Sequence, residues 1–288
     1  MSKLVLLLSL ACAAGAEPFP YRATVVAIED LTPAIKRVRF RLEDGLRFKP
    51  GQYVFLKLPD DYVVQWNERF GTSHQEVFRP YSFASSASRL PWFDLMIEHA
   101  PAPPGEDLPP GVASTYVHQS LREGDVLRFS APAGGALSFK KDTRRPIVAI
   151  AERAGAAPFV SLLEYWFENQ WERNQPIYLF LSDPLLDARF REWERTRKTF
   201  HYYPVSGPVR DLSAVPRDAE AYVAGSPAMI REVARMLKVR GIPEERIHYD
   251  GAAAPSGAAR LTASSVASMS AALWAKEIEH CLAASGKK

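Results

Sequence analysis

An unusual mixture of residues occupies positions 78–86, FRPYSFASS, where an Arg, a Pro, a Tyr and three Ser interrupt an otherwise apolar run. Pro has no backbone N–H to donate, so a strand that contains it is expected at the edge of a sheet. One interpretation is therefore an ordinary edge strand with an incidental Arg. The other is a strand whose polar side chains bind a ligand, and the neighbouring sequence has to distinguish the two.

Short strands bounded by turn residues surround this stretch. Apolar and polar residues alternate over 21–31, 35–44 and 51–59. Alternation with a period of two is typical of half-buried strands, so the pattern predicts a β-barrel. Residues 60–77 are predicted to form a long loop between strands, and residues 101–111 a second connection stiffened by proline.

The pattern changes after Arg145, where apolar runs alternate with helical segments. Alternating strands and helices predict a parallel sheet covered by helices. Residues 20–142 are thus expected to form a barrel domain and residues 145–251 an α/β domain. The predicted strands lie at 146–151, 176–182, 199–205, 220–225 and 246–250, and the predicted helices at 157–171 and 227–241.

Composition excludes several classes of function. The net charge of +3 arises from Lys and Arg scattered along the chain, so no basic block indicates a nucleic-acid partner. The 6 His residues are dispersed without the spacing of metal ligands, and we expect no metal site. With 2 Cys in the chain, a four-thiolate iron-sulfur cluster is excluded as well.

The stretch at 78–86 resembles the FAD-binding barrel of the ferredoxin-NADP reductase superfamily, whose Arg-x-Tyr-Ser motif is matched by Arg79, Tyr81 and Ser82. The resemblance implies that the Arg79 guanidinium bridges the FAD pyrophosphate, that Tyr81 lies against the isoalloxazine ring and that Ser82 hydrogen-bonds near its N5. Tyr81 and Ser82 are for this reason the candidate catalytic residues. The resemblance also implies a six-stranded antiparallel barrel of Greek-key topology, followed by a parallel α/β domain that binds NAD(P).

A second segment of the same family lies at residues 111–135, GVASTYVHQSLREGDVLRFSAPAGG. In the family, a Gly-x-x-Ser sequence opens a helix whose N-terminal amides face the pyrophosphate. A Gly-Asp turn and a Pro-x-Gly follow in the expected order, and residues 50–53, PGQY, add a further landmark. The alternative is a barrel of this fold that has lost its flavin. The residues that the resemblance assigns to FAD binding here are Gly111, Val112, Ala113 and Ser114.

The nucleotide-binding half departs from the family pattern. A glycine-rich turn, Gly-Gly-Thr-Gly-x-Ala-Pro, normally lets the backbone approach the dinucleotide. At 151–158, AERAGAAP, the chain retains Gly155 and Pro158 but has Glu152 and Arg153 at the two leading Gly positions. A side chain at either position could block that approach, and Glu152 would add a negative charge near an anionic ligand. Arg153 could instead contact phosphate.

A second departure lies at 221–230, AYVAGSPAMI. The family commonly has Cys-Gly-Pro-x-x-Met there, and the chain retains Gly225, Pro227 and Met229 but has Ala224 in place of the Cys that faces the nicotinamide. The resemblance offers Gly225 and Met229 for nucleotide binding.

The choice between NADH and NADPH rests on a few charged residues. Asp183 follows a predicted strand at a place where a carboxylate could bond the ribose 2′-hydroxyl, which favours NADH. Arg189 and Arg191 favour NADPH. A charged surface helix explains all three residues equally well.

The resemblance implies a flavoprotein reductase that takes hydride from NADH or NADPH onto FAD and passes electrons to a separate acceptor, either a small molecule or a redox protein. The alternative is a flavin-binding electron-transfer or interaction protein that has lost direct use of NAD(P)H. The acceptor and the oligomeric state are left open.

The two ends of the chain lie outside this resemblance. Residues 1–16 carry one Lys, an apolar run from Leu4 to Ala14 and small residues before a cleavage site after Ala16, as in a signal peptide. The apolar run is shorter than the roughly 20 residues that span a bilayer. We therefore expect export through a secretory pathway without a transmembrane span in the mature chain; an N-terminal membrane anchor is the alternative. Residues 252–288 are predicted to form a linker and a C-terminal helix.

Overall fold

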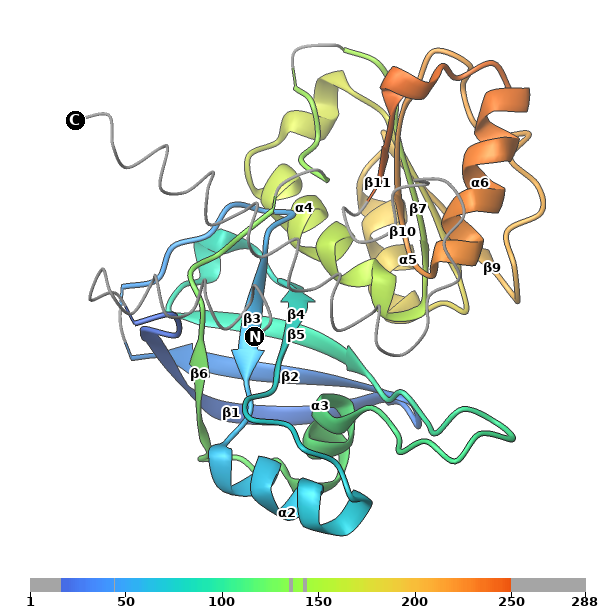
Figure 1. Cartoon of the computed structure of the whole chain (residues 1–288). Helices are drawn as coiled ribbons and strands as arrows, with labels where there is room; N and C mark the ends of the chain where they lie inside the picture. The colour runs from blue at the N-terminus through green and yellow to red at the C-terminus, as the bar shows by residue number, and fades with distance from the viewer. Residues whose placement is uncertain (1–16, 44, 135–136, 142–143, 250–288) are drawn as a thin grey trace, which may run out of the picture.

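The computed structural model describes residues 17–43, 45–134, 137–141 and 144–249. These residues form an antiparallel barrel followed by a parallel sheet with helices on both faces (Figure 1). The predicted residues of the signal peptide and of the C-terminal linker and helix lie outside the described residues.

The first domain is a six-stranded antiparallel sheet in the order β4-β3-β6-β1-β2-β5. An isolated bridge between Phe83 and Leu95 joins its two outer strands and closes the sheet into a barrel. Phenylalanine rings fill the interior, where Phe40 lies 5.2 Å from Phe93 and 5.1 Å from Phe129. The strands are β1 (Tyr21–Thr32), β2 (Ile35–Leu42), β3 (Tyr53–Lys57), β4 (Phe78–Ser82), β5 (Trp92–Glu98) and β6 (Val126–Phe129).

Two helices cover one end of the barrel. Helix α2 (Asp60–Phe70) packs against a helix that begins as α3 (Val112–Thr115) and continues as a π-helix over Tyr116–Ser120; the rings of Tyr62 and Tyr116 are 4.7 Å apart. The prediction of a loop over 60–77 was therefore wrong.

The reason that α2 forms is local. Only Val63 and Trp66 of this helix are buried, so its apolar stripe is short. Asp60 and Asp61 lie in the first turn, where the positive end of the helix dipole favours acidic side chains. Gly71 ends the helix in the left-handed conformation, with φ of 63°.

The second domain is a five-stranded parallel sheet in the order β11-β10-β7-β8-β9. Helices α4 (Ala157–Glu168) and α5 (Asp187–Thr196) pack on one face, and α6 (Pro227–Val239) packs on the other. The prediction of a six-stranded antiparallel domain followed by a parallel α/β domain is confirmed. The strands are β7 (Ile147–Glu152), β8 (Ile177–Ser182), β9 (Phe200–Val205), β10 (Glu220–Ala224) and β11 (Ile247–Tyr249), with single-turn helices at Ala87–Arg89 (η1), Arg153–Ala156 (η3), Trp171–Asn174 and Glu244–Arg246.

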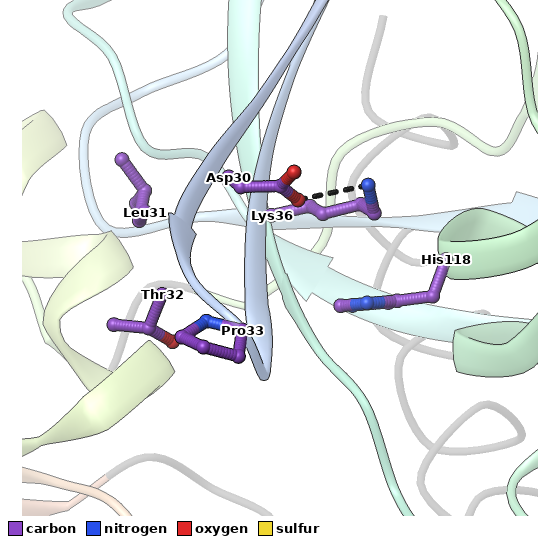
Figure 2. Close-up of a pocket in the computed structure, with 6 residues that line it drawn as sticks. All are labelled: Asp30, Leu31, Thr32, Pro33, Lys36 and His118. Carbon is purple, nitrogen blue, oxygen red and sulfur yellow. Dashed lines mark ion pairs between the residues drawn. The ribbon is translucent and has the colours of Figure 1, made fainter.

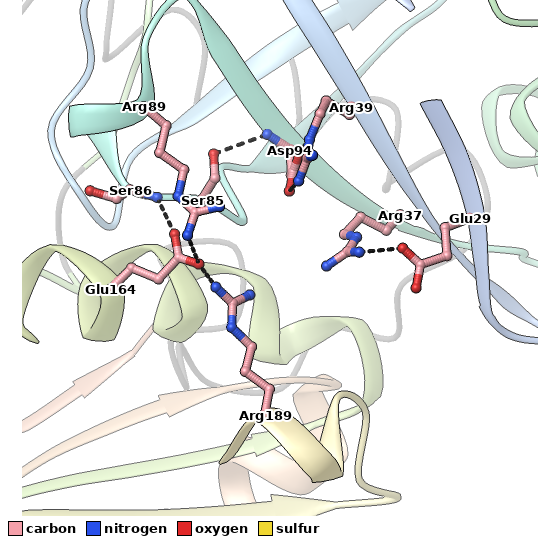
Figure 3. Close-up of polar contacts among 9 residues, drawn as sticks. All are labelled: Glu29, Arg37, Arg39, Ser85, Ser86, Arg89, Asp94, Glu164 and Arg189. Atoms are coloured by element: carbon pink, nitrogen blue, oxygen red, sulfur yellow. Dashed lines mark hydrogen bonds and ion pairs between the residues drawn. The ribbon is translucent and has the colours of Figure 1, made fainter. Parts of the chain in front are cut away.

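The two domains share an interface that is apolar at its centre. Ile35, Ala84 and Met96 of the barrel belong to the same buried cluster as residues of α4. Charged side chains from both domains meet beside this cluster, around the carboxylate of Glu164 (Figure 3). Among the described residues, none of the helices combines the length and apolar character needed to cross a membrane.

Candidate flavin and nucleotide site

The Arg-x-Tyr-Ser motif forms most of β4, which pairs with β3 alone and so lies at the edge of the hydrogen-bonded order. Pro80 is exposed at this edge, where the absence of a backbone N–H costs no ladder hydrogen bond. Arg79, Tyr81 and Ser82 are each half-buried. Their arrangement places polar side chains on a strand whose ladder of hydrogen bonds runs to β3, with a single bridge to β5 at Phe83.

These three polar side chains make few hydrogen bonds to other described residues. The Arg79 guanidinium donates to the Phe78 carbonyl oxygen at 2.8 Å, and within the described part of the chain it has no carboxylate partner. The hydroxyls of Tyr81 and Ser82 likewise make no hydrogen bond to any described residue. Unpaired polar groups at a half-buried position are costly unless a ligand or water satisfies them.

Burial also perturbs the ionisation of this strand. It lowers the pKa of Arg79, since a guanidinium loses hydration there without gaining a neighbouring anion, and it raises the pKa of Tyr81 to about 12. Arg79 stays charged at neutral pH. A phosphate would supply the missing anion, so this part of the structure fits the pyrophosphate of FAD.

The Gly-x-x-Ser segment lies where the prediction expects it, at the start of the helix over 112–120. The first N–H groups of a helix have no intrahelical acceptor and can bind an anion. The Ser114 hydroxyl, however, is already engaged: it donates to the Gly111 carbonyl oxygen at 3.0 Å and accepts from Ala100 N at 3.1 Å. A Cβ on Gly111 would approach Ser114 Oγ and Ala100 Cβ to 2.9 Å, so this close packing requires glycine.

The helix start and β4 border the same barrel core. Val112 and Ala113 are buried in the cluster against which the Tyr81 ring packs. Two residues beyond Ala113, Thr115 has a buried hydroxyl oxygen with no hydrogen-bond partner among the described residues. No sequence motif had nominated Thr115.

The retained glycines of the nucleotide half hold two loops together. A Cβ on Gly155 would lie 2.7 Å from the carbonyl oxygen of Ala224, so the loop after β7 can pack on the end of β10 only with glycine there. Pro158 is buried in the first turn of α4. Met229 donates its backbone N–H to Ser226 Oγ at 3.3 Å, while its side chain packs partly buried against the core under α6. Pro158 and Met229 thus have structural roles in shaping the loops.

The charged residues around Asp183 are mostly committed to protein partners. Asp183 is exposed at the end of β8, and its Oδ1 accepts from Gly207 N at 3.2 Å. Arg191 bonds Asp187 at 2.7 Å, and Arg189 pairs with Glu164 at the domain interface. Both arginines weighed for nucleotide selectivity are thus paired with carboxylates of the protein. Asp183, in contrast, uses Oδ1 for Gly207 N, and its Oδ2 has no hydrogen-bond partner among the described residues.

A further pocket of about 610 Å³ lies beside the β1–β2 turn, and His118 from the helix that follows Gly111 lines part of it (Figure 2). An ion pair of 2.8 Å joins Lys36 to Asp30 at its edge. Burial, together with the nearby His99 and Lys36, lowers the pKa of His118, while a hydrogen bond to the Ile97 carbonyl works in the opposite direction. No signal in the sequence had marked this pocket. Its lining residues are Asp30, Leu31, Thr32, Pro33, Lys36 and His118.

Comparison with known proteins agrees with this geometry. Residues 22–137 match the family of oxidoreductase FAD-binding domains. Over 279 residues, the chain is 27% identical to a subunit of the Na(+)-translocating NADH-quinone reductase of Klebsiella pneumoniae, with 80% of this chain and 67% of that protein covered. It is 28% identical to the ferredoxin-NAD(P)(+) reductase component of the naphthalene 1,2-dioxygenase system of Pseudomonas putida, covering 80% of this chain and 68% of that one.

Solved structures show the same fold. The FAD/NAD-binding domain of a nitric oxide dioxygenase from Vibrio cholerae superposes with a TM-score of 0.67 at 19% identity, covering 81% of this chain and 98% of that one. A ferredoxin-NADP+ reductase from Neisseria gonorrhoeae with bound FAD and NADP superposes with a TM-score of 0.59 at 15% identity, covering 82% and 99%.

Together, the motifs, the two-domain fold and these similarities define a flavoprotein oxidoreductase. Residues 22–137 match the oxidoreductase FAD-binding domain family, and the chain shares the two-domain fold of the ferredoxin-NADP+ reductase from Neisseria gonorrhoeae. The match over residues 22–137 supports FAD as the cofactor of this chain, and the Neisseria gonorrhoeae structure holds both FAD and NADP.

Proposed function

We propose that the chain binds FAD along β4 and transfers electrons from a pyridine dinucleotide to a separate acceptor. The observation that carries this proposal is the set of polar side chains on β4, because Arg79, Tyr81 and Ser82 have the chemistry of flavin ligands and lack described partners that would explain them as structural residues. The relatives include a component of a quinone reductase and a reductase for a ferredoxin, so the acceptor class stays open.

In this proposal each residue of the motif has one task. Arg79 neutralises the pyrophosphate, Tyr81 orients the ring by packing against it, and the Ser82 hydroxyl donates a hydrogen bond beside the reacting nitrogen. FAD, when bound, supplies a ring that accepts hydride and releases electrons singly or in pairs. The exposed Asp183 supports NADH over NADPH, because Arg189 and Arg191 are both paired with carboxylates.

A second function is favoured by one observation, the contact of the Glu152 carboxylate with Ser226 N at the end of β10. A side chain seated there supports a flavoprotein that receives its electrons from a donor other than NAD(P)H. Export through a secretory pathway would favour this function as well, because NAD(P)H is mainly intracellular. That localisation is a proposal from residues 1–16 alone.

An anaerobic visible spectrum distinguishes the two functions. The purified chain is reconstituted with FAD, and the flavin band is recorded before and after addition of NADH, then NADPH, then dithionite. We expect a flavin band that NADH bleaches. A band that persists with both nucleotides and is removed by dithionite would establish the second function, and a chain that retains no flavin would contradict both.

A further inference from the structure

The most informative departure from the family lies where the parallel sheet reverses its order. The chain runs from β7 outward through β8 to β9 and then returns to place β10 on the other side of β7. In open parallel sheets, ligands bind in the crevice that such a reversal leaves at the carboxyl ends of the strands. Here that crevice lies between the ends of β7 and β10, where Ala151 pairs with Ala224.

The side chain of Glu152 already fills this crevice. Its Oε1 accepts a hydrogen bond of 2.6 Å from Ser226 N. A Cβ on Gly225, whose φ is 158°, would lie 2.7 Å from Glu152 Cγ and 3.2 Å from Oε1. The carboxylate arm therefore lies directly over the Gly225 backbone, in the space that a glycine at this position would otherwise leave for a ligand.

Charge favours this position for an anion. Ser226 is the N-cap of α6, a helix of 13 residues whose N-terminus carries partial positive charge. The same partial charge would attract the phosphates of a dinucleotide. Glu152 thus places a carboxylate at the helix end that an incoming anion would seek, and it repels that anion in addition to filling its space.

The neighbouring residue, Arg153, fixes the turn that follows Glu152 at the end of β7. Arg153 adopts a left-handed conformation with φ of 49°, which is strained for a residue with a Cβ. Its Nη2 lies 2.7 Å from Glu98 Oε1 at the end of β5, so the loop is tied to the barrel. Both residues that replace family glycines consequently have specific partners, one in each domain.

We propose that Glu152 is an intramolecular competitor of the pyridine dinucleotide, and that its carboxylate must leave Ser226 N before the nucleotide can bind. This inference rests on the proposed function, since it concerns the nucleotide site of the same oxidoreductase. On this inference the Glu152 side chain lowers the affinity of the protein for NAD(P)H, and the fold by itself would permit tighter binding.

Calorimetric titration of the FAD-loaded chain with NAD+ and NADP+ tests the inference without relying on turnover. Removing a charge-assisted hydrogen bond that the ligand must displace corresponds to roughly a ten- to hundredfold change in Kd. We expect Glu152→Gly to tighten binding of the preferred nucleotide by this factor. Glu152→Gln, which keeps the shape and loses the charge, should give a smaller gain.

Glu232→Gln is the matched control. Glu232 lies on the exposed face of α6, the helix that Ser226 caps, and pairs there with Arg235 at 2.7 Å. This substitution should leave Kd unchanged. Equal affinity, within threefold, of the parent chain and both Glu152 variants would overturn the inference. Flavin content and dithionite bleaching of each protein separate this failure from failure of the proposed function: an inference that fails alone leaves a normal flavin spectrum, whereas a chain without flavin contradicts the function itself.

Discussion

Among single residues, Arg79 gives the strongest support for a bound anionic ligand. Burial lowers the pKa of this half-buried guanidinium, and among the described residues no carboxylate offsets that loss of hydration, so a bound anion would stabilise the charged form. One other partly buried arginine, Arg39, behaves differently. It makes two hydrogen bonds to Asp94, of 2.7 and 3.0 Å, and this raises its pKa.

We expect Arg79→Gln to weaken FAD binding by about 10- to 100-fold, since a hydrogen bond to a charged group contributes roughly 1.5–3 kcal/mol. Fluorescence quenching of FAD on titration with the apoprotein measures the Kd. Arg41→Gln, on an exposed position of β2, is the control and should bind FAD as the parent chain does. Equal Kd values for the Arg79 and Arg41 variants would show that Arg79 does not hold the pyrophosphate.

The packing of secondary-structure elements depends on Gly155, which lets the loop after β7 contact the end of β10. Gly155→Ala places a methyl group 2.7 Å from a backbone oxygen, and backbone cannot move aside as a flexible side chain can. We expect a loss of roughly 1–3 kcal/mol in the free energy of unfolding, the usual cost of overpacking. Urea denaturation measures it.

Gly45→Ala is the matched control for this substitution. A Cβ at Gly45 would meet nothing within 4 Å, so the same chemical change should cost little there. If both variants unfold at the same urea concentration, the close contact between the two loops is not the reason that Gly155 is retained.

Elements with a clear pattern of apolar residues were predictable from the sequence. Elements with few buried residues were not. The apolar runs of β7 and β8 predicted buried strands because their residues are buried on both sheet faces. Helix α2 was missed because Val63 and Trp66 are its only buried residues, although Asp60, Asp61 and Gly71 were signals of its two ends.

The candidate site divides in the same way. Arg79, Tyr81 and Ser82 could be nominated because a local motif contains all three. The contact between Glu152 and Ser226 could not be predicted, because it joins residues 74 positions apart and depends on which strands become neighbours. The sequence indicated only that a charged side chain stood where glycine was expected.

Over the whole molecule, the domains are joined by a polar cluster whose centre is one carboxylate (Figure 3). Glu164 on α4 is buried, at 4% exposure, and its Oε2 accepts from Ser86 N at 2.7 Å. Its Oε1 lies 3.2 Å from Arg89 of the barrel and also pairs with Arg189 of α5. Burial and the nearby guanidiniums of Arg89 and Arg37 lower the pKa of Arg189 to about 10, so positive charge is crowded here and Glu164 balances it.

Glu164→Gln should therefore loosen the two domains from each other. Removing one member of a buried ion pair costs about 3–5 kcal/mol, and we expect the lower end of this range because Arg89 is 44% exposed. Differential scanning calorimetry should show an earlier transition, and limited proteolysis faster cleavage between the domains. Glu168→Gln is the control, since Glu168 is exposed and, among the described residues, bonds only the Ser86 hydroxyl, at 2.5 Å. An unchanged transition in the Glu164 variant would mean that the other contacts, among them the shared apolar cluster and the Arg153–Glu98 ion pair, hold the domains, and that the flavin and nucleotide halves of the site keep their relative position without this carboxylate.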